Sequence, residues 1–320
     1  MSFIGGNGPG VLQKANEMAV SIVGATGFIG KRLVKRLLAD DHRVHVLTRS
    51  RPKALSFFPV EEFPNVVIAE QPEWKDSIQA STAVVNLAGH HIATKWTPEV
   101  KKEIRDSRII TTSKVVDIIN SLPDELRPKV FISSSACGYY GTSETLTFDE
   151  QSPPGMDYLA EVCREWEAAA HGVDSNVRLV VLRIGVVLGL EGGALANMIP
   201  PFKMFAGGPT GSGNQWFPWI HMDDQIEFFI EAIRNPAYTG AFNTSAPNPV
   251  RLSELCTHLG SVLGRPSWLR VPAFVLRFAL KEGAYVLLEG QNMVPKKAME
   301  LGFVFKHPNV KDALRDICIR

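Results

Sequence analysis

Short apolar runs alternate with amphipathic stretches along the first 190 residues of the chain. The runs have the length and content of buried strands, which we place at residues 19–23, 44–47, 66–69, 83–87, 130–133 and 179–187. In the amphipathic stretches apolar side chains recur every three or four positions, which predicts helices at 29–38, 98–121 and 158–171. Strands and helices in alternation predict an α/β fold built on a doubly wound parallel sheet.

The chain changes character near residue 190. Gly and Pro become dense from residue 192 to 218, and amphipathic stretches follow at 224–234 and 252–263. We therefore expect a Rossmann-type nucleotide-binding domain over 19–190 and a smaller, loop-rich C-terminal lobe over 191–320 that holds the substrate. The Gly-rich residues 1–18 show no secretory signal. They are interpreted as a flexible leader or as the remnant of an organelle-targeting segment.

Composition places the chain among ordinary globular proteins. Its 320 residues are 45% hydrophobic and 21% charged, and the formal net charge is +1. This balance gives the whole protein no attraction to nucleic acid or to an anionic membrane. The longest apolar run, 177–190, contains two arginines and is shorter than the about 20 residues of a transmembrane helix. The four cysteines follow no metal-binding or disulfide pattern, so we expect no metal site and a reducing compartment.

A glycine-rich turn separates the first predicted strand from the first predicted helix. Residues 24–30 read Gly-Ala-Thr-Gly-Phe-Ile-Gly. Backbone amides in such a turn, together with the positive end of the helix dipole, bind a pyrophosphate. We expect cofactor contacts from Gly24, Thr26, Gly27, Phe28, Ile29 and Gly30. The alternative is a tight strand-to-helix turn that binds no ligand.

The end of the second strand indicates which dinucleotide the chain prefers. An acidic side chain about 20 residues past the glycine motif would bind the ribose 2′-hydroxyl of NAD. Arg49 stands there instead, and no Asp or Glu lies between residues 47 and 51. An arginine binds a 2′-phosphate through charge-assisted hydrogen bonds. The sequence therefore predicts NADP(H), the alternative being that Arg49 and Arg51 are surface groups in water.

Several further motifs occur together with the glycine turn, at residues 86–89, 133–135, 138–141, 182–189, 207–224 and 288–303. They resemble the short-chain dehydrogenase/reductase superfamily in its extended, epimerase-like branch. Within that branch the chain resembles the atypical YfcH-like or SulA-homologue proteins with a C-terminal domain of unknown function, and among these the plastid Giant Chloroplast members of plants. The resemblance covers residues 19–318. It implies cofactor contacts from Asn86, Ala88 and Gly89, and a chloroplast location, with the cytoplasm as the alternative.

The resemblance also implies a catalytic pattern that this chain carries only in part. Short-chain dehydrogenases use a Ser, a Tyr and a Lys four residues after the Tyr. Ser135 and Tyr158 match the first two, but the lysine position is Val162. A phenol without a neighbouring cation keeps a pKa of about 10 and is a poor base at neutral pH. Tyr139, Tyr140 and His221 are the candidate substitutes.

Three features of the second half remain ambiguous at this level. Arg183 lies inside an apolar strand, where an unpaired charge is unfavourable, so we expect a structural ion pair. The loop 205–224, with its two tryptophans, either encloses a substrate or packs the two lobes together. His221 and Asp223 at its end are either site residues or structural.

Two functions remain open from the sequence. The first is an NADP(H)-binding, epimerase-like oxidoreductase that acts on a small carbonyl or alcohol, with sugar-like compounds among the candidates. The second is a catalytically weak or inactive NADP(H)-binding regulatory or interaction protein, with plastid division as the setting that the resemblance implies. The helices at 98–121 and 158–171 are those through which many relatives pair, so a homodimer is also open.

Overall fold

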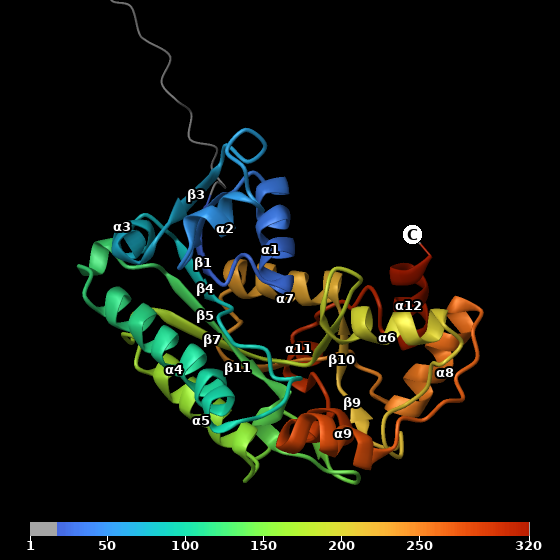
Figure 1. Cartoon of the computed structure of the whole chain (residues 1–320). Helices are drawn as coiled ribbons and strands as arrows, with labels where there is room; N and C mark the ends of the chain where they lie inside the picture. The colour runs from blue at the N-terminus through green and yellow to red at the C-terminus, as the bar shows by residue number, and fades with distance from the viewer. Residues whose placement is uncertain (1–17, 320) are drawn as a thin grey trace, which may run out of the picture.

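A seven-stranded parallel sheet forms the centre of the protein, which is described here for residues 18–319 of a computed structural model (Figure 1). Its strands are β1 (Ala19–Val23), β2 (Arg43–Leu47), β3 (Val66–Ala69), β4 (Ala83–Asn86), β5 (Val130–Ala136), β7 (Arg178–Ile184) and β11 (Gly240–Thr244). They lie in the order β11-β7-β5-β4-β1-β2-β3. The predicted doubly wound α/β fold is thus confirmed.

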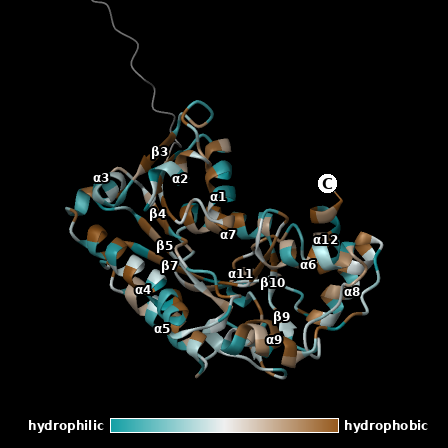
Figure 2. Ribbon diagram, in the orientation of Figure 1, coloured by the Kyte–Doolittle hydropathy of each residue, from teal (hydrophilic) through white to brown (hydrophobic). Residues whose placement is uncertain are grey.

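Helices cover both faces of this sheet. They are α1 (Phe28–Ala39), α2 (Arg51–Leu55), α3 (Trp74–Gln79), α4 (Pro98–Asn120), α5 (Tyr158–His171) and α7 (Met222–Arg234). The apolar sides of α1 and α7 pack on one face of the strands, and α4 and α5 pack on the other. Figure 2 shows the apolar strands lying between these helix layers. Strands covered on both faces read as continuous apolar runs, which is why the sequence identifies them.

The second lobe packs beside the carboxyl ends of the strands. Its elements are β8 (Val186–Leu188), α6 (Gly193–Lys203), β9 (Trp216–Phe217), β10 (Trp219–His221), β12 (Val250–Arg251), α8 (Leu252–Leu263), α9 (Ala273–Leu280), α10 (Tyr285–Leu288), β13 (Asn292–Met293) and α12 (Val310–Cys318), while β6 (Thr147–Phe148) pairs with β13. Helix α11 (Lys296–Glu300) instead packs on β11, and its Ala298 belongs to the core of the sheet. A separate apolar core joins α6, α8 and α12. No helix in residues 18–319 is long and apolar enough to cross a membrane.

The boundary expected at residue 190 does not separate the sheet from this lobe. Both α7 and β11 come after that residue, yet α7 packs on α1 and β11 pairs with β7. The chain therefore returns to the sheet before it completes the second lobe. The expectation for residues 1–18 falls, apart from Met18, outside the described residues.

The observed ends of helices match the predicted ends where the sequence has a capping residue or a long helical repeat of apolar positions. The expected Thr97 cap is present, because its hydroxyl accepts a hydrogen bond from the Val100 amide at 3.3 Å. Helix α5 has the predicted bounds. The single run expected at 179–187 is instead two strands, β7 and β8, which are separated at Gly185.

Candidate functional site

The glycine turn after β1 has the backbone geometry that its sequence predicts. Gly24 has a φ of +81°, and a Cβ there would lie 2.8 Å from the Leu87 carbonyl carbon. A Cβ at Gly30 would lie 2.3 Å from the Gly24 oxygen. Gly27 caps the start of α1, whose first amides lack intrahelical acceptors and form the positive end of the helix dipole. The turn is therefore built for an anion at the α1 N-terminus.

A cavity of about 710 Å³ opens at this turn. It lies where β2 and β4 diverge on either side of β1, the switch point at which parallel sheets bind ligands. Thr48 and Arg49 line it after β2, Ala88 and Gly89 line it after β4, and the first half of α4 closes it. Its volume falls within the about 300–1,000 Å³ of ordinary ligand pockets.

Arg49 and Lys102 are cations that line this cavity, and Lys102 is already paired with Asp106. The Arg49 side chain is exposed and makes no hydrogen bond or ion pair with any residue between 18 and 319. Arg51 is committed elsewhere, because it donates to the Ile68 carbonyl at 2.8 Å and pairs with Glu73 at 2.5 Å. Of the two arginines in the predicted segment, only Arg49 is placed for a phosphate.

The expected cofactor residues do not all reach this cavity. Six of the ten line it, namely Gly24, Thr26, Gly27, Arg49, Ala88 and Gly89. The ring of Phe28 instead packs beside Gly189, where a Cβ would lie 3.0 Å from Cζ of Phe28. Ile29 packs on the main core, and Gly30 is buried within the turn. Residues 28–30 therefore shape the turn and do not line the cavity.

Asn86 does not line the cavity but supports the loop that does. Its side chain is fully buried, and its Nδ2 donates to the Thr112 hydroxyl at 2.7 Å. Its Oδ1 accepts a hydrogen bond from the Ala88 amide at 3.1 Å. The side chain thereby fixes the turn that carries Ala88 and Gly89 into the cavity.

Arg108 is a residue of this region that the sequence analysis missed. Its guanidinium donates to the His90 carbonyl at 3.0 Å and to the Ile104 carbonyl at 2.8 Å. A Cβ at Gly89 would lie 3.1 Å from its Cζ. These contacts place its positive charge directly behind the loop that follows β4. No carboxylate of a described residue pairs with it. The sequence shows Arg108 only as one more polar position of a long helix, because its inward direction depends on the packing of α4.

Ser135 lies in a buried polar network. Its hydroxyl donates to Glu167 Oε1 at 2.6 Å, and Glu167 accepts from Arg183 at 2.9 and 2.8 Å. This confirms the structural ion pair expected for Arg183. Burial alone would lower the pKa of Arg183, but the hydrogen bonds and charge of Glu167 outweigh it and hold that pKa above its usual value. Ser135 is thus engaged by a carboxylate.

Tyr158 lines a different cavity from the one at the glycine turn. It starts α5, and its hydroxyl donates to the Lys101 carbonyl. Burial raises the pKa of Tyr158 above its usual value, and the charges of Arg105 and Arg108 lower it only in part. Val162 is 2% exposed, so a lysine at this position would be buried. The structure does not assemble Ser135 and Tyr158 into one exposed pair.

The two tyrosine substitutes, Tyr139 and Tyr140, differ in whether the hydroxyl is already bonded to the protein. The Tyr140 hydroxyl donates to Asn243 at 2.6 Å, and burial raises its pKa to about 12. The Tyr139 hydroxyl makes no hydrogen bond with a described residue, while its ring lies 3.4 Å from the Arg183 guanidinium. Of these two tyrosines, Tyr139 has the available hydroxyl.

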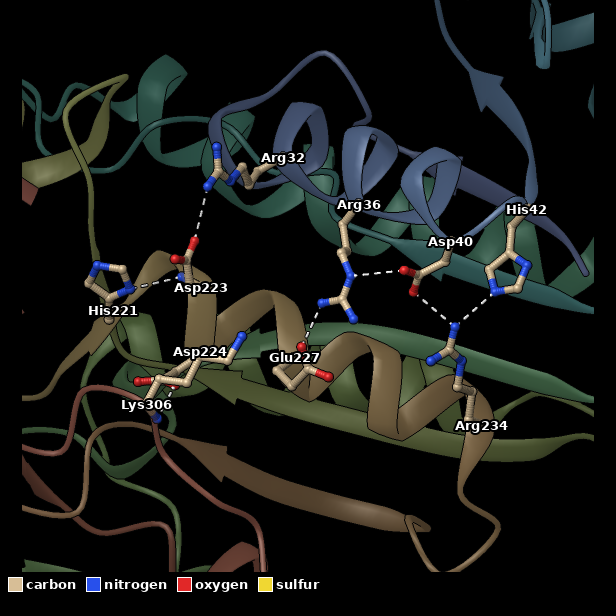
Figure 3. A network of polar contacts seen from close by, with 10 residues as sticks. All are labelled: Arg32, Arg36, Asp40, His42, His221, Asp223, Asp224, Glu227, Arg234 and Lys306. Carbon is tan, nitrogen blue, oxygen red and sulfur yellow. Dashed lines mark hydrogen bonds and ion pairs between the residues drawn. The ribbon is translucent and has the colours of Figure 1, made fainter. Parts of the chain in front are cut away.

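His221 precedes α7, at one end of a row of charged side chains between α1 and α7 that we call the charged seam (Figure 3). Its Nδ1 accepts the Asp223 amide at 3.0 Å and caps α7. Asp223, His307 and Asp316 bring ligating atoms within 4.8 Å of one another and of His221. Because Nδ1 accepts a proton donor, Nε2 carries the ring proton and offers no lone pair to a metal. The arrangement supports a structural role for His221.

Asp223 also belongs to this seam. Its carboxylate pairs with Arg32 at 3.1 Å, and Arg36 pairs with Glu227 at 2.6 Å on the next turns of the same two helices (Figure 3). These pairs align α1 on α7. The seam therefore supports the position of the glycine turn, which begins α1.

Comparison with known proteins agrees with this architecture. Residues 20–244 match the NAD dependent epimerase/dehydratase family, and residues 271–317 match a domain of unknown function, DUF1731. The chain is 62% identical to the epimerase family protein SDR39U1 homolog, chloroplastic, of Arabidopsis thaliana, over 95% of this chain and 88% of that protein. It is 34% identical to the epimerase family protein YfhF of Bacillus subtilis, over 94% of this chain and 98% of the relative.

Solved structures of epimerase-family proteins are also similar to this chain. The human epimerase family protein SDR39U1, crystallised with NADPH, superimposes with a TM-score of 0.84 at 32% identity, covering 95% of this chain and all of that one. A UDP-glucuronic acid 4-epimerase from Bacillus cereus shares the fold at 16% identity, with a TM-score of 0.75 over 94% of this chain and 98% of the other. The family model covers residues 20–244, and relatives of 62% and 34% identity align over 94–95% of the chain. This protein therefore belongs to the NAD dependent epimerase/dehydratase family.

Proposed function

We propose that this protein binds NADP(H) in the cavity at the glycine turn and transfers hydride between it and a small carbonyl or alcohol. The observation that carries the proposal is the position of Arg49, which follows β2, lines the same cavity as Gly24 and Gly27, and has no ion-pair partner among residues 18–319. A relative that is 32% identical was crystallised with NADPH, which supports the same cofactor here.

The residues present fit this dinucleotide. A pyrophosphate would meet the amides at the start of α1, because Gly27 adds no Cβ on the approach. The 2′-phosphate would meet Arg49, and no acidic side chain follows β2 to repel it. Arg108, held behind Gly89, adds positive charge on the β4 side of the cavity.

The chain's own contribution to chemistry is mainly positioning. When bound, the nicotinamide ring supplies or accepts the hydride. Asn86 fixes the loop that carries Ala88, and Arg108 braces the same loop from behind. Proton transfer would depend on Tyr158 or on Tyr139, since the hydroxyl of Tyr140 is buried and bonded. Tyr158 lines a different cavity, so its hydroxyl would have to exchange the Lys101 carbonyl for the substrate. We expect that transfer to be slow at neutral pH, because no lysine stands at position 162.

Removing the Tyr158 hydroxyl tests this assignment. In the alcohol-oxidation direction, Tyr158→Phe should lower turnover at least about 10²-fold, the lower end for general acid–base catalysis, and leave NADPH affinity unchanged. Wild-type turnover should rise about tenfold per pH unit through neutrality, because burial keeps the pKa of Tyr158 above about 10. Steady-state rates between pH 6 and 10, with a panel of alcohols, provide the measurement. Undiminished turnover in Tyr158→Phe, together with its loss in Tyr139→Phe, would move the role to Tyr139.

A second candidate function is a sensor of NADP(H) that turns nothing over. It is favoured by one observation, namely that Ser135 is bonded to Glu167 and Tyr158 to Lys101 in separate places. The resemblance to Giant Chloroplast-type proteins would give such a sensor a role in plastid division. NADPH binding without consumption of NADPH across a broad carbonyl panel would favour it.

The same proposal includes a cellular location, a class of substrate and an oligomeric state. A relative at 62% identity is described as chloroplastic, which supports a chloroplast location. The substrate is a small molecule, and pairing through α4 and α5 would give a homodimer. Fluorescence imaging of the tagged full-length protein tests the location, and light scattering tests the pairing.

A further inference from the structure

A second cavity, of about 590 Å³, lies between the start of α5 and the segment that contains α9 and α10. Trp96, Tyr158 and Tyr285 contribute aromatic rings to its wall. None of the residues that line it lines the dinucleotide cavity as well, within the described part of the chain. The two cavities can therefore be tested independently.

The polar ends of these three rings are already satisfied by the protein. Trp96 donates to the Ile92 carbonyl at 2.8 Å, and Tyr285 donates to Asp157 Oδ2 at 2.8 Å. The Tyr158 hydroxyl donates to the Lys101 carbonyl. What the rings offer to a ligand is consequently apolar surface, from Tyr285 and from the part of the Tyr158 ring that the Lys101 ammonium, 4.5 Å from its centroid, leaves uncovered. Trp96, 5% exposed, supports the wall from behind and meets Tyr158 edge to face with centroids 5.4 Å apart. Such a wall favours a flat, apolar ring system.

The rim of the cavity carries charge, and part of it is already neutralised. Glu282 pairs with Lys101 at 2.8 Å, and Asp157 accepts hydrogen bonds from Tyr285 and from the Ala160 amide at 3.0 Å. Both acids therefore have partners inside the protein.

Arg277 and Lys281 are the cations of the same rim. Their side chains are exposed, line the cavity and form no ion pair with any residue in 18–319. The Lys281 amide donates to the Arg277 carbonyl, so the two residues stand one helical turn apart. Glu289, which also lines the cavity, donates its amide to the Tyr285 carbonyl at 3.0 Å and so lies at the Tyr285 side. An anion is favoured beside the two cations and disfavoured beside Glu289.

We propose that this cavity is a second ligand site, which takes a flat, largely apolar ring compound with one carboxylate held by Arg277 and Lys281. The site gives α9 and α10, within the segment that matches a domain of unknown function, a binding role. Tyr158, the candidate for proton transfer in the proposed function, belongs to its wall. The inference is therefore tested by binding alone, which needs no turnover of NADP(H).

The test uses 2-naphthoate as the probe and 2-naphthylmethanol as its neutral match. Calorimetric titration of the full chain should show saturable, one-site binding of 2-naphthoate, about tenfold tighter than binding of the alcohol. The double variant Arg277→Gln, Lys281→Gly should lose that tenfold preference and keep its affinity for the alcohol. Lys281 has a φ of +53°, which glycine adopts without strain, so the replacement at this position should not lower the Tm.

A blocking variant and a cofactor titration complete the experiment. Ala284, 1% exposed, lines the cavity, so Ala284→Phe should abolish binding of both probes. NADPH affinity should be unchanged in each variant, which shows that the chain is folded and keeps this result separate from the proposed function. Absence of 2-naphthoate binding to the wild type, or equal binding to the double variant, would overturn the proposal. If Ala284→Phe does not fold, the double variant decides alone.

Discussion

Replacing Arg183 with leucine should destabilise the protein by about 3–5 kcal/mol, the cost of leaving a buried charge without its partner. The Arg183 and Glu167 side chains are 6% and 9% exposed and lie 2.8 Å apart. Without the guanidinium, the Glu167 carboxylate would keep one hydrogen bond, from Ser135. Urea unfolding followed by circular dichroism measures the loss.

The matched control removes both charges. Arg183→Leu combined with Glu167→Leu should recover a large part of the stability, because no unpaired charge remains in the interior. A double variant at least as unstable as Arg183→Leu would show that the pair contributes through packing and not through charge. Lys296→Leu provides a surface comparison, since its pair with Asp149 is half exposed and should contribute little to stability.

Replacing Arg49 with alanine should weaken NADPH binding by about 1.5–3 kcal/mol, the range for hydrogen bonds to charged groups. This is roughly 10- to 150-fold in affinity. NADH carries no 2′-phosphate, so its affinity should stay unchanged. Stability should also stay unchanged, because Arg49 contacts no described residue through a hydrogen bond or an ion pair. Calorimetry with both dinucleotides gives the comparison.

Arg51→Ala is the matched control for Arg49→Ala. Arg51 is two residues away but holds the Ile68 carbonyl and Glu73. Its removal should lower the Tm and leave the ratio of NADPH to NADH affinity as it is in the wild type. A ratio that collapses in Arg51→Ala but survives in Arg49→Ala would assign the phosphate to Arg51.

Much of the fold could be predicted because its strands are buried on both faces. Apolar runs such as 19–23 and 83–87 admit no other interpretation once helices separate them. Strand β11, Gly240–Thr244, was missed, because it contains only two apolar residues and takes its place through pairing with β7. The sequence therefore located a change in composition at residue 190, whereas pairing decides which residues belong to the sheet.

The cofactor half of the site was more accessible to sequence reasoning than the catalytic half. The glycine turn would bind through its backbone, and the end of β2 would bind through the Arg49 side chain. Local structure fixes the position of both. The partners of Ser135 and Tyr158 come from distant elements, Glu167 on α5 and Lys101 on α4. Arg108 was missed for the same reason, because only packing places its charge behind Gly89.

Titration of the wild-type protein with NADPH and NADH tests the central claim most directly. The cavity at the glycine turn, with Arg49 at its edge and no acidic residue after β2, predicts a dissociation constant for NADPH at least about tenfold below that for NADH. The measurement is calorimetric and needs no substrate. Equal affinities, tighter binding of NADH, or no saturable binding of either dinucleotide would contradict the assignment of this cavity to NADP(H).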